Sequence, residues 1–125
     1  MPIVAFVATT TPARAKEFYA NVLELSLLSE DGFALMFDAG GTKLRVAIVR
    51  EHRPAGNTVL GWIVPDIRRS LQDLTSRGVK FNRYEEFEQD EFGIWTSPSG
   101  ARVAWFGDPD GNTLSLTEFE SEESS

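Results

Sequence analysis

The sequence predicts an α+β fold in which one order of elements, a strand, a helix and then three strands, occurs twice within 125 residues. The first half shows a short apolar run, then apolar residues at helical spacing, then three short runs typical of strands. The same order begins again at residue 59 and ends with a hairpin whose turn is the segment 108–112. Because such a repeat decides the architecture, we expect two βαβββ modules. Each has its helix on one face of a sheet, and the other face curls around a cleft.

The first module is predicted over residues 1–51. A buried strand over residues 3–8 stops before Thr11 and Pro12, which are typical of the N-cap and the first position of a helix. The helix has one apolar face, formed by Ala15, Phe18, Tyr19, Val22 and Leu23. Three strands separated by turns that contain glycine are then predicted over residues 25–29, 33–38 and 43–49.

The second module is predicted over residues 57–119. Its helix has Ile67, Leu71 and Leu74 on one face and stops at Gly78. Strands are predicted over residues 59–64, 79–84, 94–96, 101–107 and 113–118, with an acidic connection over residues 85–91. Alternate residues of the last strand face the core, and those between them can line a cavity: Thr113, Ser115 and Thr117.

Composition restricts the kind of protein that the chain can be. With 42% hydrophobic residues, a single domain over residues 1–120 is expected, followed by an acidic, disordered tail over residues 120–125. The absence of cysteine excludes disulfides and thiolate metal sites. The formal charge of −7 disfavours nucleic acid and anionic membranes as partners. Since the first residues form neither a basic leader nor an apolar run that spans a bilayer, a cytoplasmic protein is expected.

Three groups of residues carry a resemblance to a known family. They are residues 16–19 with 22–25, residues 63–67, and residues 105–116, which contain the Asp-Pro-Asp-Gly-Asn turn. Together they resemble the vicinal oxygen chelate (VOC) superfamily, which groups glyoxalase I, bleomycin-resistance proteins, fosfomycin-resistance enzymes and extradiol dioxygenases. The resemblance covers nearly the whole chain. It implies paired βαβββ modules and commonly a homodimer, in which the partner borders each cleft.

The same resemblance implies where a metal would be bound, because the family's metal enzymes place one ligand on each of four strands. Carried over by position, these ligands fall on Val4, Leu60, Ser115 and, on the fourth strand, Arg45 or Ala47. None of these side chains binds a divalent cation well. The composition agrees, since the single histidine, His52, lies in a polar connection. We therefore predict no metal and no cofactor.

Six residues are predicted to line the cleft and to bind a ligand: Phe6, Arg45, Leu60, Trp62, Ser115 and Thr117. Trp62 can stack on a planar ring, or it can fill its own cavity or a dimer seam. Arg45 can hold a carboxylate or a phosphate, or it can simply meet solvent. Ser115 has no histidine nearby in sequence to act as a base, so nucleophilic catalysis is not expected.

Other aromatic and acidic residues are given a structural interpretation first. Trp95 and Trp105 lie on neighbouring predicted strands, where packing in the core or an interface is favoured over ligand stacking. The acidic connection over residues 85–91 can attract a cationic ligand, although a solvated loop is the more ordinary interpretation.

These observations support three functional hypotheses. The favoured one is metal-independent binding of a small, partly aromatic molecule, with a possible role in sequestration or resistance. The second is a VOC enzyme, a glyoxalase-like lyase or isomerase or a dioxygenase, with a displaced metal site or metal-free chemistry. The third is a structural or interaction protein whose cleft is filled by its own side chains. The balance is against an enzyme.

Overall fold

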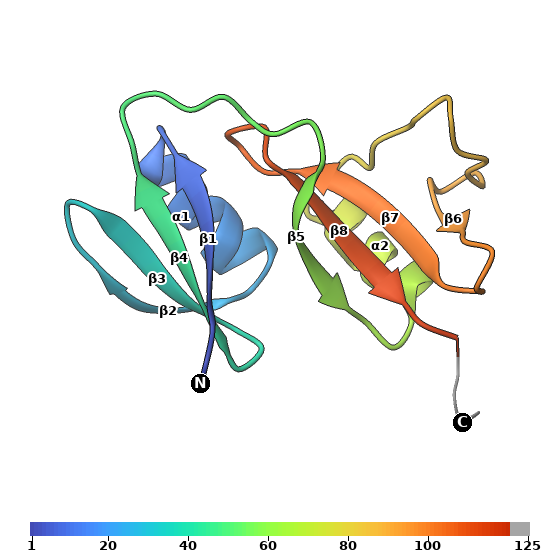
Figure 1. Cartoon of the computed structure of the whole chain (residues 1–125), viewed down its shortest axis with the longest axis horizontal. Helices are drawn as coiled ribbons and strands as arrows, with labels where there is room; N and C mark the ends of the chain where they lie inside the picture. Colours follow the sequence, from blue (N-terminus) through green and yellow to red (C-terminus); the bar gives the residue numbers. More distant parts are fainter. Residues whose placement is uncertain (121–125) are drawn as a thin grey trace. The chain divides into compact units, whose positions relative to one another are not determined.

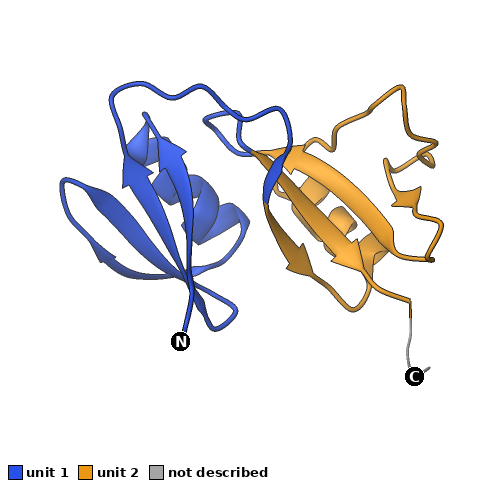
Figure 2. Ribbon diagram, in the orientation of Figure 1, with its two compact units in different colours: residues 1–59, 108–112 blue, residues 60–107, 113–125 orange. Residues whose placement is uncertain are grey.

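The computed structural model describes residues 1–120 of the chain. The predicted acidic tail therefore lies, except for Glu120, outside the described residues. The chain divides into two compact units, which we describe separately (Figure 2). Unit 1 consists of Met1–Val59 with Asp108–Asn112, and unit 2 consists of Leu60–Gly107 with the segment that begins at Thr113. The turn of the C-terminal hairpin is thus part of the first unit, whereas both of its strands belong to the second.

Unit 1 contains a four-stranded sheet and one helical segment (Figure 1). Its elements are β1 (Val4–Thr9), α1 (Pro12–Glu17), the π-helical turn η1 (Phe18–Val22), β2 (Ser26–Glu30), β3 (Ala34–Ala39) and β4 (Thr42–Ile48). The strand order is β1-β4-β3-β2, so β1 is an edge strand, and it runs parallel to β4. The predicted order of one strand, a helix and three strands is confirmed.

The core of unit 1 lies between the sheet and the helical segment. Side chains that are fully buried there come from η1 (Tyr19), β3 (Phe37) and β4 (Leu44 and Val46). The predicted single helix continues from α1 into η1, where the wider turn is closed by a hydrogen bond from Leu23 N to Phe18 O. This segment presents its apolar side to the sheet, as the helical spacing of the sequence predicts.

Unit 2 repeats the same topology. Its elements are β5 (Thr58–Ile63), which begins at the last two residues of the first segment of unit 1, α2 (Ile67–Ser76), β6 (Trp95–Thr96), β7 (Arg102–Gly107) and β8 (Thr113–Glu118). The sheet order is β5-β8-β7-β6. Helix α2 begins where Asp66 accepts a hydrogen bond from Arg69 N and where Glu118 Oε1 accepts one from Ile67 N. Its buried face packs against one face of the sheet, where the buried residues are Ala104, Phe106, Leu114 and Leu116. The α+β fold of two βαβββ-like modules is therefore present.

One predicted strand is wrong. Residues 79–84 do not form a strand: Phe81 makes a single bridge to Phe106 of β7, and Asn82 N donates a hydrogen bond to Trp105 O. The chain then leaves the sheet and returns as β6, which pairs with the other end of β7. The predicted acidic connection is thus a loop that interrupts the outer strand of the sheet. Within residues 1–120, no helix has the length and the apolar character needed to cross a membrane.

Candidate functional site

The face of the unit 2 sheet that α2 does not cover, which we call the helix-free face, carries the polar residues predicted from the sequence. On β8, Leu114 and Leu116 point to the helix, so Ser115 and Thr117 point to the opposite face. The register places Trp105 of β7 opposite Ser115 and Val103 opposite Thr117. Since Trp95 of β6 pairs with Val103, both tryptophans lie on the same face as the two hydroxyls.

These tryptophans belong to an aromatic cluster on the helix-free face. The cluster consists of Tyr84, Phe87, Trp95 and Trp105, and all four side chains are half-buried. Phe87 stacks on Trp105 with ring centroids 5.1 Å apart and lies 4.8 Å from the ring of Trp95. Tyr84 meets Trp105 edge-on at 5.4 Å. Such packing holds each ring in a fixed orientation while leaving part of its surface accessible.

The loop over residues 84–93 holds Phe87 in place through its own hydrogen bonds. The amide of Gln89 accepts from Tyr84 N at 2.7 Å and donates to Asn82 O at 3.0 Å and to Gly93 O at 2.8 Å. Asp90 Oδ1 accepts from Phe92 N and Ile94 N, both at 2.9 Å. Because side chains satisfy these backbone groups, the loop keeps a defined shape with a single bridge between Gln89 and Trp95 in place of a strand ladder.

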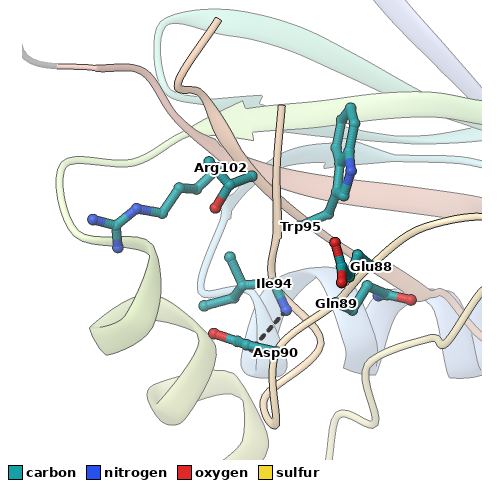
Figure 3. Close-up of a pocket in the computed structure, with 7 residues that line it drawn as sticks. Glu88, Gln89, Asp90, Ile94, Trp95 and Arg102 are labelled. Atoms are coloured by element: carbon teal, nitrogen blue, oxygen red, sulfur yellow. Dashed lines mark hydrogen bonds between the residues drawn. The ribbon is translucent and has the colours of Figure 1, made fainter. Parts of the chain in front are cut away.

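A hollow of about 660 Å³ lies where this loop meets β6 and β7 (Figure 3). Seven residues line it: Glu88, Gln89, Asp90, Ile94, Trp95, Thr96 and Arg102. Its volume is within the range of small-molecule sites. The lining combines one large ring with three charged side chains, so the hollow is polar at its rim and aromatic on one wall.

Two of the predicted ligand-binding residues, Leu60 and Trp62, do not lie beside Ser115. A Cβ added at Gly61 would clash with Ser115 Oγ, so Gly61 is the residue of β5 that shares the face of Ser115. Alternate residues of a strand point to opposite faces, and Leu60 and Trp62 therefore lie on the side of α2. Both are half-buried there. The expected register of β5 is wrong by one residue.

In unit 1, the predicted residues of β1 and β4 share one face of their sheet. Phe6 is the register partner of Arg45, and Ala47 is the partner of Ala8. Val4 and Phe6 are 43% and 59% exposed, because the helical segment covers the opposite face. Arg45 Nη1 lies 3.9 Å from Met36 Sδ of the neighbouring strand β3. Phe6 and Arg45 thus form an adjacent aromatic and cationic pair.

The Asp-Pro-Asp-Gly-Asn turn is held by buried hydrogen bonds within unit 1. Asp108 Oδ2 accepts from Tyr19 OH at 2.7 Å and from Asn112 Nδ2 at 2.8 Å. Burial and the charge of Asp108 raise the pKa of Tyr19 above its ordinary value. Asn112 Nδ2 also donates to Ala8 O, so Asn112 Oδ1 is the acceptor for His52 Nε2 at 2.6 Å, and that nitrogen carries the proton.

Asp110 of the same turn accepts hydrogen bonds from the hydroxyls of Thr9, Thr10 and Thr11 and from Thr10 N. Burial acts to raise the pKa of Asp110, but the bonds from the threonines outweigh it and lower this pKa below its ordinary value. The polar side chains of the most distinctive motif of the sequence therefore have a structural use, because Asp108, Asp110 and Asn112 fix the turn.

The residues present do not fit the metal that the family's enzymes bind. Across residues 1–120, no three side chains of the His, Cys, Asp or Glu type gather where they could hold an ion. At the positions to which the resemblance carries the metal ligands, Val4 has no donor atom and Ser115 offers only a hydroxyl.

Sequence reasoning missed Tyr84 and Phe87 and gave the two tryptophans on the helix-free face a packing role first. The hairpin itself held the signal for one of them, because Trp105 and Ser115 stand at equal distances from the middle of the turn and must face each other across it. The fold of the loop over residues 84–93 depends on Gln89, and nothing in the local pattern marked that residue.

Comparisons with known proteins were made for the sequence and for the structure. No curated protein matches the sequence significantly. A superfamily member from Sphaerobacter thermophilus DSM 20745 is 25% identical, with 94% of this chain and 96% of that chain covered and a TM-score of 0.71. TnmS3, an antibiotic binding protein from Streptomyces sp. CB03234, is 22% identical, with 96% of each chain covered and a TM-score of 0.75. A lactoylglutathione lyase from Agrobacterium tumefaciens is 15% identical, with 94% and 92% covered and a TM-score of 0.69.

A match to a family model assigns the chain to a family. It covers residues 3–116, which is nearly the whole chain and includes strands of both sheets. The chain belongs to the Glyoxalase/Bleomycin resistance protein/Dioxygenase superfamily.

Proposed function

We propose that this chain is a metal-independent binding protein for a small, partly aromatic molecule. The observation that carries the proposal is the juxtaposition of Trp105 with Ser115 and Thr117 on the helix-free face of the unit 2 sheet. An indole offers a large π surface for stacking, and a neighbouring hydroxyl offers one oriented hydrogen bond. This combination of an apolar surface with few polar groups is typical of ligand sites. Sequestration of a toxic compound is one physiological form of such binding.

The comparisons support binding as one activity within this fold, since TnmS3 is described as an antibiotic binding protein. The fold also serves a lactoylglutathione lyase, so the fold alone does not choose between a binder and an enzyme. The side chains of this chain favour the binder. Within residues 1–120, no hydrogen bond links Ser115 to a histidine or carboxylate that would act as a base, and no three His, Cys, Asp or Glu side chains gather where they could hold a metal ion.

Binding of 2-naphthol, followed through the indole N–H signals of the three tryptophans in a ¹⁵N-labelled sample, tests this proposal. We expect the Trp105 signal to shift with saturation, and the variant Trp105→Leu to lose binding. The matched control is Trp62→Leu, which alters a tryptophan on the other face of the same sheet and is expected to keep the affinity. Binding that survives Trp105→Leu, or that fails in Trp62→Leu when both variants are folded by circular dichroism, contradicts the proposed site.

We further propose a homodimer formed through unit 1. Large apolar side chains are exposed along its edge strand β1 and at the residue before it: Ile3 at 73%, Val4 at 43% and Phe6 at 59%. Such a concentration of apolar surface is typical of an interaction site. Sedimentation equilibrium measures the mass, and a monomer at all concentrations contradicts this assembly. The cytoplasmic location stays a prediction.

A further inference from the structure

We propose that the hollow beside β6 binds the cationic group of a small organic ligand, between the ring of Trp95 and the carboxylate of Glu88. The inference rests on the proposed function, because it names the chemical class of molecule that unit 2 binds. It concerns a different part of the aromatic cluster, since Trp95 lines the hollow and Trp105 does not.

The charges around the hollow favour a cation. Glu88 and Asp90 contribute two carboxylates, and Arg102 contributes one guanidinium. In Figure 3 the Glu88 carboxylate lies on the same side of the hollow as the Trp95 ring, whereas the guanidinium of Arg102 extends to the opposite side. The rest of the loop adds to the negative potential, because Glu85, Glu86 and Glu91 lie in the same short segment.

The two carboxylates differ in what they already bind. Asp90 Oδ1 accepts hydrogen bonds from two backbone N–H groups and so maintains the shape of the loop. Glu88 is exposed, and within residues 1–120 its carboxylate takes part in no ion pair or hydrogen bond. Glu88 is therefore the carboxylate that can turn to a ligand without a loss of loop structure.

The Trp95 ring supplies the second half of the recognition. Phe87 packs on it at 4.8 Å and restricts its movement, and its remaining surface forms a wall of the hollow. A cation near the face of an indole is attracted by the quadrupole of the ring. The same loop already shows this interaction elsewhere, because Arg68 Cζ lies 4.5 Å from the centre of the Phe92 ring.

Three probes of one size test the charge preference: benzylammonium, benzyl alcohol and benzoate. Each is titrated into the ¹⁵N-labelled full chain at pH 7, and the indole N–H of Trp95 is the readout. We expect benzylammonium to shift the Trp95 signal most strongly, benzyl alcohol weakly, and benzoate not at all. Equal affinity for the alcohol, preference for benzoate through Arg102, or no shift at Trp95 overturns the inference.

A pair of matched variants distinguishes binding by the carboxylate in the hollow from attraction by the overall negative potential of the loop. Glu88→Gln removes the carboxylate that lines the hollow, and Glu86→Gln removes an exposed loop carboxylate that does not. We expect the dissociation constant for benzylammonium to rise about three- to fivefold in Glu88→Gln and to stay within error in Glu86→Gln. Equal effects in the two variants show a diffuse field and contradict the site.

Failure here is distinguishable from failure of the proposed function. If 2-naphthol still shifts Trp105 while benzylammonium does not bind, aromatic binding stands and the cation site is wrong. If benzylammonium binds at Trp95 while 2-naphthol does not shift the Trp105 signal, the proposed aromatic site at Trp105 is wrong and the proposed cation site in the hollow is supported.

Discussion

At the scale of single residues, Glu24 is the position where backbone geometry and residue type disagree. It has φ of 60°, in the left-handed region, and no other residue except glycine has a positive φ within the described chain. The conformation lets the chain turn from η1 into β2, and Leu25 N donates to Tyr19 O across the turn. A side chain in this region strains the backbone, whereas glycine does not.

We expect Glu24→Gly to raise the free energy of unfolding by about 0.5 to 1 kcal/mol, because the relief of strain exceeds the larger chain entropy of glycine. Urea denaturation followed by tryptophan fluorescence measures the change. The matched control is Glu17→Gly, at φ of −60° in the helical segment, which we expect to lower stability. A loss of stability in both variants would show that the interactions of the Glu24 side chain stabilise the fold by more than its backbone strain costs.

At the scale of elements, the close approach of β5 to β8 depends on the pair Gly61 and Ser115. Because a Cβ at Gly61 would meet Ser115 Oγ, we expect Gly61→Ala to destabilise the protein by about 1 to 3 kcal/mol. In Gly61→Ala/Ser115→Ala the hydroxyl is gone and the new methyl fits, so most of the loss is recovered. Thermal unfolding of the two single variants and the double variant gives the coupling. Additive effects would contradict this contact.

The same strand pair shows what the sequence could and could not predict. The alternation in β8 placed Ser115 and Thr117 correctly, because leucines alternate with hydroxyls there. In β5, Leu60 and Trp62 alternate with Gly61 and Ile63, and both sets contain apolar residues, so the pattern gives no register. Residues 79–84 look like a strand by composition, but long-range pairing with β7 and the hydrogen bonds of Gln89 decide their structure.

The turn at Asp108–Asn112 makes the stability of unit 1 depend on pH. The pKa of Asp110 is lowered in the folded state, so its bonds to the threonines contribute stability above the unfolded pKa of about 3.8 and lose it as the pH falls through the folded pKa. We expect stability to fall below about pH 4 in the wild type. The fall is smaller in Asp110→Asn, which has no charge to lose. Parallel curves of unfolding free energy against pH would contradict this role.

For the whole molecule, the order of elements was predictable because the same pattern, a strand, a helix and further strands, occurs twice in one short chain. The positions of the two units relative to one another do not follow from such local patterns. The chemical character of the chain did follow: one histidine, no cysteine and a charge of −7 leave carboxylates as the main potential donors. Among residues 1–120, the carboxylates lie on strands, turns, helix surfaces and the loop over residues 84–93, and no three of them gather where they could hold a metal ion.

This dispersal leads to a prediction about metals that applies to the whole chain. A ligand that binds the folded state alone raises its stability by about 2.7 kcal/mol at a concentration one hundred times its dissociation constant. We expect Ni²⁺ or Zn²⁺, added in small molar excess after treatment with a chelator, to leave the unfolding temperature unchanged. Any weak shift should disappear in His52→Gln, because His52 is the single imidazole. Stoichiometric metal that survives dialysis and stabilises both the wild type and His52→Gln would mean that carboxylates assemble a site, and an enzyme of the superfamily would then replace the binder.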